Sequence, residues 1–226
     1  MPAPSSLPLN VPAPKPVLQV QQLHFAYPGA PVLVARWSHA VPAGVTWLRG
    51  DTGSGKTTLL SLLAGERAVG GGLVLAGVDL RVDAAAYRRG LFWHDPASAD
   101  SQACHALTPP DIAARLRPRH PRFDDVAWQQ HLQGFGLGPH LAKPLFALST
   151  GTRRKVWLAA ALSAGCALTL LDEPTAGLDA PSVAYLMQAL AHCADNAAWP
   201  GRATVVASGV PLAGVPLADV IALPLA

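Results

Sequence analysis

The 226-residue sequence predicts an α/β fold with a mostly parallel sheet at its core, and two observations carry that prediction. Short apolar runs that favour strands alternate with longer segments that favour helices, most clearly after residue 150. A glycine-rich stretch, residues 50–57, joins the apolar run 45–48 to the helix-forming segment 58–64. Strands and helices that alternate in this way indicate parallel strands covered by helices on both faces.

Ahead of the glycine-rich stretch, the pattern favours an antiparallel β subdomain. Residues 17–25 alternate roughly between apolar and polar, and two further apolar runs, 32–35 and 45–48, follow turns that contain proline and glycine. We expect these three strands to form a meander that leads into the glycine-rich stretch. Residues 1–16 are rich in proline and are expected to be a disordered arm.

The rest of the chain alternates strands with helices, apart from one segment of different composition. Strands are expected at 73–77, 91–93, 167–171, 204–207 and 220–223, and helices at 83–89, 152–164 and 180–194. Prolines divide residues 96–148 into short amphipathic pieces, which indicates a helical lobe inserted into one domain of residues 17–226.

The glycine-rich stretch matches the phosphate-binding pattern G-x-x-x-x-G-K-[ST], so the fold class is that of a P-loop NTPase. Its residues are Gly50, Asp51, Thr52, Gly53, Ser54, Gly55, Lys56 and Thr57, and Thr58 follows in the helix. The glycines let consecutive backbone N–H groups point at phosphate oxygens, Lys56 can reach the outer phosphates, and the Thr57 hydroxyl can ligate Mg²⁺. The alternative is a glycine-rich turn that matches by chance.

Two adjacent carboxylates, Asp172 and Glu173, end the apolar run 167–171. A buried strand can deliver such acids to a phosphate site at its carboxyl end. We expect Asp172 to hold Mg²⁺ and Glu173 to polarise the attacking water, with Lys56 as a further catalytic residue. The alternative is a strand that ends in solvated acids.

A second helix start precedes these acids by about one helix length. Ser149 is a good N-cap for the helix 152–164, and Gly151 permits a close backbone approach. By itself this pattern indicates only a capped helix. Its position between the phosphate loop and the paired acids is what singles it out.

Together, these motifs resemble those of ATP-binding cassette (ABC) ATPase subunits, the nucleotide-hydrolysing halves of ABC transporters, over residues 17–223. Residues 148–155 (LSTGTRRK) are similar to the family signature motif, 170–174 (LLDEP) to its magnesium and catalytic-base segment, and 176–179 (AGLD) to its D-loop. The resemblance implies that ATP and Mg²⁺ are bound and that Tyr27 stacks on adenine. It also implies a head-to-tail dimer, in which Ser149 and Gly151 contact the ATP of the other domain and Asp179 lies at the interface.

The sequence departs from the family pattern at two positions. His94 stands where a magnesium-sensing Gln is expected, and this is similar to the haem-exporter ATPases of cytochrome c maturation; His94 is therefore a catalytic and metal-contacting candidate, or else a packed loop histidine. Gly209 stands where the family has a switch His. A missing preorganised donor commonly costs about 10²–10³ in rate, so we expect slowed hydrolysis.

Composition argues against several other classes. A net charge of +3 with scattered basic residues argues against a nucleic-acid surface, and the three basic residues 153–155 are better explained as phosphate-adjacent or solvated. The odd number of cysteines and the absence of a secretory signal indicate reduced thiols in a cytoplasmic protein. Five histidines between 94 and 140 share no metal-ligand spacing, so a metal site there is the weaker interpretation.

The hypothesis that the sequence favours is an ATP-hydrolysing subunit of an ABC transporter, peripheral on the cytoplasmic face of the membrane. Its expected partners are a second ABC ATPase domain, identical or different, and separate transmembrane permease subunits; nucleic acid is not expected. The first alternative is a degenerate cassette that binds ATP and regulates with weak or no turnover. The second is a soluble cassette protein of ribosomes or DNA repair, which the single short cassette disfavours.

Overall fold

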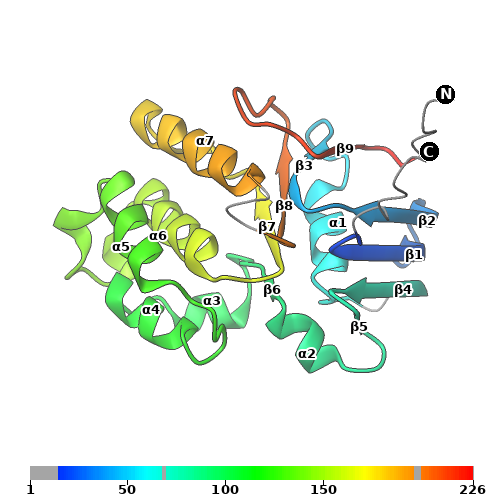
Figure 1. The fold of residues 1–226 in the computed structure, drawn as a ribbon, viewed down its shortest axis with the longest axis horizontal. Helices are drawn as coiled ribbons and strands as arrows, with labels where there is room; N and C mark the ends of the chain where they lie inside the picture. Colours follow the sequence, from blue (N-terminus) through cyan, green and yellow to red (C-terminus); the bar gives the residue numbers. More distant parts are fainter. Residues whose placement is uncertain (1–14, 68–69, 196–199, 226) are drawn as a thin grey trace, which may run out of the picture.

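Two β-sheets and the helices around them make up the computed structural model, which describes residues 15–67, 70–195 and 200–225 (Figure 1). The predicted α/β class with a parallel and an antiparallel sheet is confirmed. All but the last two residues of the predicted proline-rich arm, 1–16, lie outside the described residues.

The larger sheet is wholly parallel. Its strands are β3 (Gly44–Arg49), β6 (Leu91–Phe92), β7 (Leu168–Asp172), β8 (Ala203–Ser208) and β9 (Asp219–Ala222). They lie in the order β6-β7-β8-β3-β9, so strands that are far apart in sequence become neighbours. Every residue of β8 is buried, because this strand lies at the centre of the sheet. The carboxyl ends of β3, β7 and β8 therefore come together at one edge.

The smaller sheet is antiparallel. Its strands are β1 (Leu18–Ala26), β2 (Val32–Val41), β4 (Gly70–Leu75) and β5 (Val78–Asp79), in the order β2-β1-β4-β5. The predicted three-strand meander is wrong at its third strand, because β3 pairs with β8 and β9 in the parallel sheet. Val45 and Leu48 are both fully buried, so β3 needs cover on both faces, and an antiparallel edge would leave one face in water.

Helices cover both faces of the parallel sheet. They are α1 (Lys56–Leu63), α2 (Ala84–Arg89), α3 (Ala99–Ala103), α4 (Pro109–Leu116), α5 (Asp125–Gly134), α6 (Thr150–Ser163) and α7 (Ala180–Ala194), with 3₁₀ turns η1 (Gly138–His140) and η2 (Leu145–Ala147). The elements from α3 to η2 fall within 96–148; that this segment is an insertion stays a prediction. Figure 1 shows α3, α4 and α5 grouped with α6 on one side of the sheet and α1 on the other.

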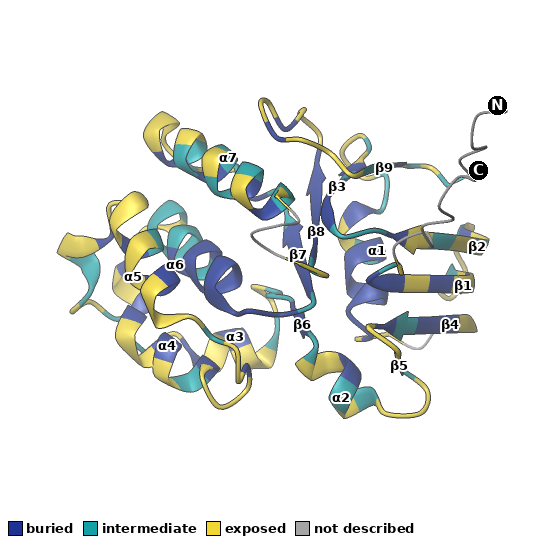
Figure 2. Ribbon diagram, in the orientation of Figure 1, coloured by how far each residue is buried: buried dark blue, intermediate teal, exposed yellow. Residues whose placement is uncertain are grey.

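Alternate residues of the central strands feed two separate cores. On β7, Leu170 packs with α1 and the antiparallel sheet, whereas Leu171 packs with α6, α7 and the helices of 96–148. On β8, Val205 and Val206 divide in the same way. Figure 2 shows the continuous buried band that results through β7, β8 and α1. Burial on both faces holds the strand ends rigidly, and this fixes the position of the residues that follow them.

Candidate active site at the carboxyl edge of the parallel sheet

The loop between β3 and α1 is curled by two glycines. Gly53 and Gly55 have φ of +81° and +96°, a region that only glycine adopts without strain. Gly55 is the N-cap of α1 and offers no side-chain acceptor, so the first N–H groups of the helix are left for another partner. A Cβ on Gly55 would lie 2.6 Å from Leu33 Cδ1, which shows that β2 packs closely beneath the loop.

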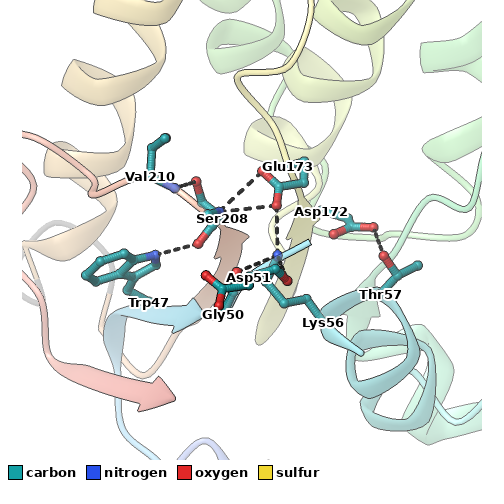
Figure 3. A network of polar contacts seen from close by, with 10 residues as sticks. Trp47, Gly50, Asp51, Lys56, Thr57, Asp172, Glu173, Ser208 and Val210 are labelled. Atoms are coloured by element: carbon teal, nitrogen blue, oxygen red, sulfur yellow. Dashed lines mark hydrogen bonds and ion pairs between the residues drawn. The ribbon is translucent and has the colours of Figure 1, made fainter. Parts of the chain in front are cut away.

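Lys56 lies inside this loop and is only 7% exposed. Its ammonium donates to the carbonyl of Gly50 at 2.7 Å and to that of Asp51 at 3.1 Å, and it lies 3.1 Å from Glu173 Oε1 (Figure 3). The side chain therefore points at the loop mouth, where an outer phosphate would be held. A buried ammonium of this kind needs charged or carbonyl partners, and the loop supplies them.

Glu173 follows β7 in a constrained conformation. Its φ is +40°, which is uncommon for a residue other than glycine. Its N–H donates to the Ala207 carbonyl on β8 at 2.9 Å, and its carboxylate accepts the Gly209 N–H, with Gly209 N 3.2 Å from Oε1 and 3.5 Å from Oε2. The carboxylate is thus held between the ends of β7 and β8, facing Lys56 (Figure 3).

Asp172 and Thr57 form the part of the site that suits a divalent cation. The Thr57 hydroxyl donates to Asp172 Oδ2 at 2.6 Å. The other oxygen, Oδ1, is buried and has no hydrogen-bond partner. Burial raises the pKa of the Asp172 carboxyl above its ordinary value, and the hydrogen bond from Thr57 opposes this. A carboxylate oxygen and a hydroxyl are ligands that Mg²⁺ prefers, and a cation there would satisfy the unpartnered oxygen.

Tyr27 lies over the start of α1. Its hydroxyl is 3.0 Å from the Thr58 hydroxyl, and the Arg67 guanidinium carbon lies 5.4 Å from its ring centroid. Tyr27 is 39% exposed, and Phe25 packs edge-on to its ring with 5.0 Å between the ring centroids. Its stacking on adenine stays a prediction.

His94 lies beside the acids but is packed against another ring. It stacks on Trp157 of α6 with ring centroids 3.8 Å apart, and both side chains line a cavity of about 470 Å³ that also contains Asp172 and Glu173. Burial lowers the pKa of the His94 imidazole to about 4, so the ring is neutral at physiological pH. A neutral ring can accept or donate one hydrogen bond; its predicted magnesium contact stays a prediction.

The signature segment forms the start of α6, as its N-cap pattern predicts. Ser149 Oγ accepts the Thr152 N–H at 3.1 Å, and Ser149 itself is exposed. Gly151 lies against the segment after Glu173, because a Cβ there would lie 2.5 Å from the Gly177 carbonyl. Asp179 is the N-cap of α7, and its carboxylate lies 2.5 Å from Lys155 Nζ. That hydrogen bond is the main reason why the pKa of Asp179 is well below its ordinary value.

The remaining loop residues differ in exposure. Asp51, Thr52 and Gly53 are exposed, whereas the Ser54 hydroxyl is buried without a hydrogen-bond partner. Sequence reasoning missed two contacts at this site: the Gly209 N–H on Glu173, and Trp47, whose indole donates to the Ser208 carbonyl at 3.1 Å. Neither contact has a local signal in the sequence, because the first depends on the pairing of β7 with β8 and the second on the pairing of β3 with β8.

Within residues 15–67, 70–195 and 200–225, no three of the His, Cys, Asp and Glu side chains gather in a way that could hold a metal ion. His131 instead bonds the Tyr185 hydroxyl at 2.8 Å, and His120 contacts the Cys166 thiol at 3.1 Å. None of the helices described in these ranges has the length and apolar character needed to cross a membrane.

A curled phosphate loop with a buried lysine, next to paired acids at the end of a parallel strand, is the arrangement of P-loop nucleotide-binding proteins. The model of the ABC transporter family matches residues 38–176, well over half of the chain. The chain therefore belongs to the ABC transporter family, as one of its ATP-binding proteins.

Relatives and solved structures agree with this assignment. A cytochrome c biogenesis ATP-binding export protein, CcmA, of Alkalilimnicola ehrlichii is 36% identical over 81% of this chain and 78% of its own length. A nickel import ATP-binding protein, NikO, of Rhodobacter capsulatus is 33% identical over 85% of this chain and 79% of its own. The predicted resemblance to cytochrome c maturation ATPases is thus confirmed. A solved ATP-binding subunit of an ABC transporter shares the fold, with a TM-score of 0.72 at 19% identity over 86% of this chain and 80% of that one.

Proposed function

We propose that this chain hydrolyses ATP and thereby energises transport through separate transmembrane subunits. ATP binding follows from the family; hydrolysis is the further step. The observation that carries it is the Glu173 carboxylate, held by the Gly209 N–H and facing Lys56 at the mouth of the phosphate loop.

Each residue of the site has a distinct task in this proposal. The loop amides and Lys56 bind the outer phosphates, while Thr57 and Asp172 hold Mg²⁺, which supplies positive charge to the phosphate oxygens. Glu173 orients a water and accepts its proton as the water oxygen bonds to the γ-phosphorus. The bond from that phosphorus to the ADP oxygen breaks, so the products are ADP and phosphate.

The working form in this proposal is a head-to-tail dimer on the cytoplasmic face of a membrane. Ser149 and Thr150 are exposed at the start of α6, which leaves them accessible to the ATP held by a second ATPase domain. Closure of the dimer on ATP and its reopening after hydrolysis would drive the conformational change of permease subunits.

Glu173→Gln tests hydrolysis separately from binding. The amide keeps the shape and the hydrogen-bond acceptor but cannot take the proton, so we expect turnover to fall about 10²–10⁴-fold while ATP affinity is retained. The matched control is Glu66→Gln, which changes the only other glutamate of the chain, an exposed residue three positions after α1. Equal turnover in Glu173→Gln and the parent protein would remove Glu173 from this role.

One observation favours a second candidate, a regulatory cassette that binds ATP with little turnover. Gly209 has no side chain at the place where the family has a switch histidine, yet a Cβ there would meet nothing closer than 3.9 Å. The backbone therefore has room for a Cβ at this position, and Gly209→His tests whether the missing side chain limits turnover. A rise in turnover in that variant would support a missing contact, and no change would indicate that another group compensates.

A further inference from the structure

The peptide that joins Ser208 to Gly209 is held from both sides. On one side, the Trp47 indole N–H donates to the Ser208 carbonyl, with 3.1 Å between the nitrogen and the oxygen. On the other side, the Gly209 N–H donates to Glu173 Oε1 at 3.2 Å. The C=O and N–H of a trans peptide point in opposite directions within one plane, so a donor that fixes the carbonyl also aims the amide.

Neighbouring contacts hold the same turn. Arg49, two residues after Trp47, is paired with Ser208 in the parallel register of β3 and β8. Ser208 is fully buried, and its hydroxyl accepts the Val210 N–H at 3.1 Å (Figure 3). The Glu173 N–H donates to the Ala207 carbonyl at 2.9 Å, which ties the same strand end to the backbone of the acid. These contacts act on Ala207, the Ser208 side chain and Val210, whereas the Trp47 indole bonds the 208–209 peptide itself.

The Trp47 contact affects the hydrogen-bond donor strength of the Gly209 N–H as well as its direction. Hydrogen-bond donation to a carbonyl polarises the peptide and makes its N–H a better donor. The acceptor is a carboxylate, so the bond from Gly209 is charge-assisted. Lys56, the other group facing Glu173, would turn towards the phosphates of bound ATP, whereas a backbone amide stays in place.

We propose that Trp47 is a positioning residue for hydrolysis: its indole aims the Gly209 N–H so that this amide orients the Glu173 carboxylate. Trp47 acts through the 208–209 peptide and does not touch the reacting atoms. The inference rests on the proposed role of Glu173 in hydrolysis. In this proposal, the backbone N–H of Gly209 makes a contact at the site where the family has the side chain of a switch histidine.

Amide hydrogen exchange in the nucleotide-free protein tests the contact without any turnover. In ¹⁵N-labelled protein, we expect the Gly209 amide to be protected and Trp47→Phe to speed its exchange about tenfold. The Val205 amide at the centre of β8 is the internal reference. Trp37→Phe, the same change in β2, is the matched control and is expected to leave Gly209 protected. An unprotected Gly209 amide in the parent, or equal acceleration at Gly209 and Val205, would overturn the proposal.

Kinetics then test the consequence for the acid. Trp47→Phe is expected to lower kcat about tenfold with KM for ATP unchanged, because the loop that binds ATP is not altered. In the Gly209→His background, a side chain supplies a contact independent of the peptide, so the same Trp47→Phe change should cost less than threefold. Equal costs in both backgrounds would show a merely structural role and overturn the proposal. If the parent and Glu173→Gln have the same turnover, Glu173 loses its proposed role in hydrolysis, and the exchange experiment still decides the Trp47 contact.

Discussion

The two helix starts that the sequence singles out, those of α1 and α6, are completed in different ways. At α1, the N-cap is Gly55, which has no side chain to accept from the helix N–H groups. At α6, the N-cap is Ser149, and its hydroxyl accepts the Thr152 N–H. Both starts have the positive end of a helix, but only the first leaves its amides without a side-chain cap.

In the proposed dimer, this difference separates a site made within one chain from one that needs a second chain. The α1 loop carries its own cation, Lys56, and faces Glu173 at the end of β7. The α6 start instead lies against the Gly177 carbonyl, and its lysine, Lys155, is engaged by Asp179. Binding of ATP is thus expected of the single chain through α1, whereas α6 would act on the ATP of a partner.

Replacing the lysine of each helix is the strongest way to break this comparison. Lys56→Ala removes charge-assisted hydrogen bonds to the outer phosphates, each worth about 1.5–3 kcal/mol, so we expect ATP to bind at least about 100-fold more weakly. Lys155→Ala is expected to leave ATP affinity of the isolated chain unchanged. Calorimetric titration with ATP and Mg²⁺ measures both. An unaltered affinity in Lys56→Ala would show that the phosphate loop is wrongly assigned.

Much of this comparison could be predicted, because local rules govern the elements on which it rests. The pattern from Gly50 to Thr57 fixes a turn that only glycines can make, and Ser149 is a favourable cap for the helix that the structure places at α6. The two acids that end an apolar run were expected at a strand end, and Asp172 is the last residue of β7. In each case the signal lies within a few residues of the feature.

What could not be predicted depends on strand pairing between distant segments. The apolar run 45–48 was assigned to a meander, because its neighbours in sequence are antiparallel strands; its partners, β8 and β9, lie far along the chain. The contact from Trp47 to Ser208 follows from that pairing and has no motif of its own. His94 was considered for its hydrogen bonds, and nothing nearby in sequence indicates that Trp157 covers its ring.

Glycine substitutions sharpen the comparison through packing. At Gly151, a Cβ would lie 2.5 Å from the Gly177 carbonyl, so Gly151→Ala must displace backbone and is expected to cost about 1–3 kcal/mol of unfolding free energy. At Gly209, an added Cβ would lie 3.9 Å and 4.0 Å from its nearest atoms. Gly209→Ala should therefore change the unfolding free energy by less than about 0.5 kcal/mol, as substitutions without a steric conflict usually do. Urea unfolding of both variants measures the difference. Equal stability would contradict the close approach between the start of α6 and the segment 174–179.

Acidification should change the unfolding free energy in opposite directions through two partly buried groups, His131 on α5 and Asp172 at the end of β7. Burial lowers the pKa of His131, which links α5 to Tyr185 of α7, to about 4, whereas burial raises the pKa of Asp172. Between about pH 6.5 and 4, the unfolded chain protonates His131 and the folded chain does not, so this residue makes the unfolding free energy fall on acidification. Asp172 is protonated more readily in the folded chain than in the unfolded chain. Its contribution to the unfolding free energy therefore rises as the pH falls towards the ordinary pKa of an aspartate.

Two variants separate these contributions. His131→Gln should flatten the loss of stability on acidification by an amount on the order of 1–3 kcal/mol over that range. Asp172→Asn should steepen the loss, because it removes the group that opposes it. Urea unfolding at pH steps from 7 to 4 gives the unfolding free energies. A slope unchanged by His131→Gln would contradict a buried, neutral imidazole at that position.

The N-cap of α6 provides the smallest and most specific test. Ser149→Ala removes the acceptor of the Thr152 N–H, which typically costs about 1 kcal/mol, while the isolated chain should bind ATP as before because the α1 loop is untouched. Ser149→Asp keeps a good cap and restores the stability, but it places a negative charge where a partner's phosphate would lie. We therefore expect Ser149→Asp to weaken ATP-dependent dimerisation. Analytical ultracentrifugation measures this when Ser149→Asp is introduced into the Glu173→Gln variant, which is expected to hydrolyse ATP slowly. Dimerisation equal to that of the background protein would show that α6 does not face the phosphate of a second chain.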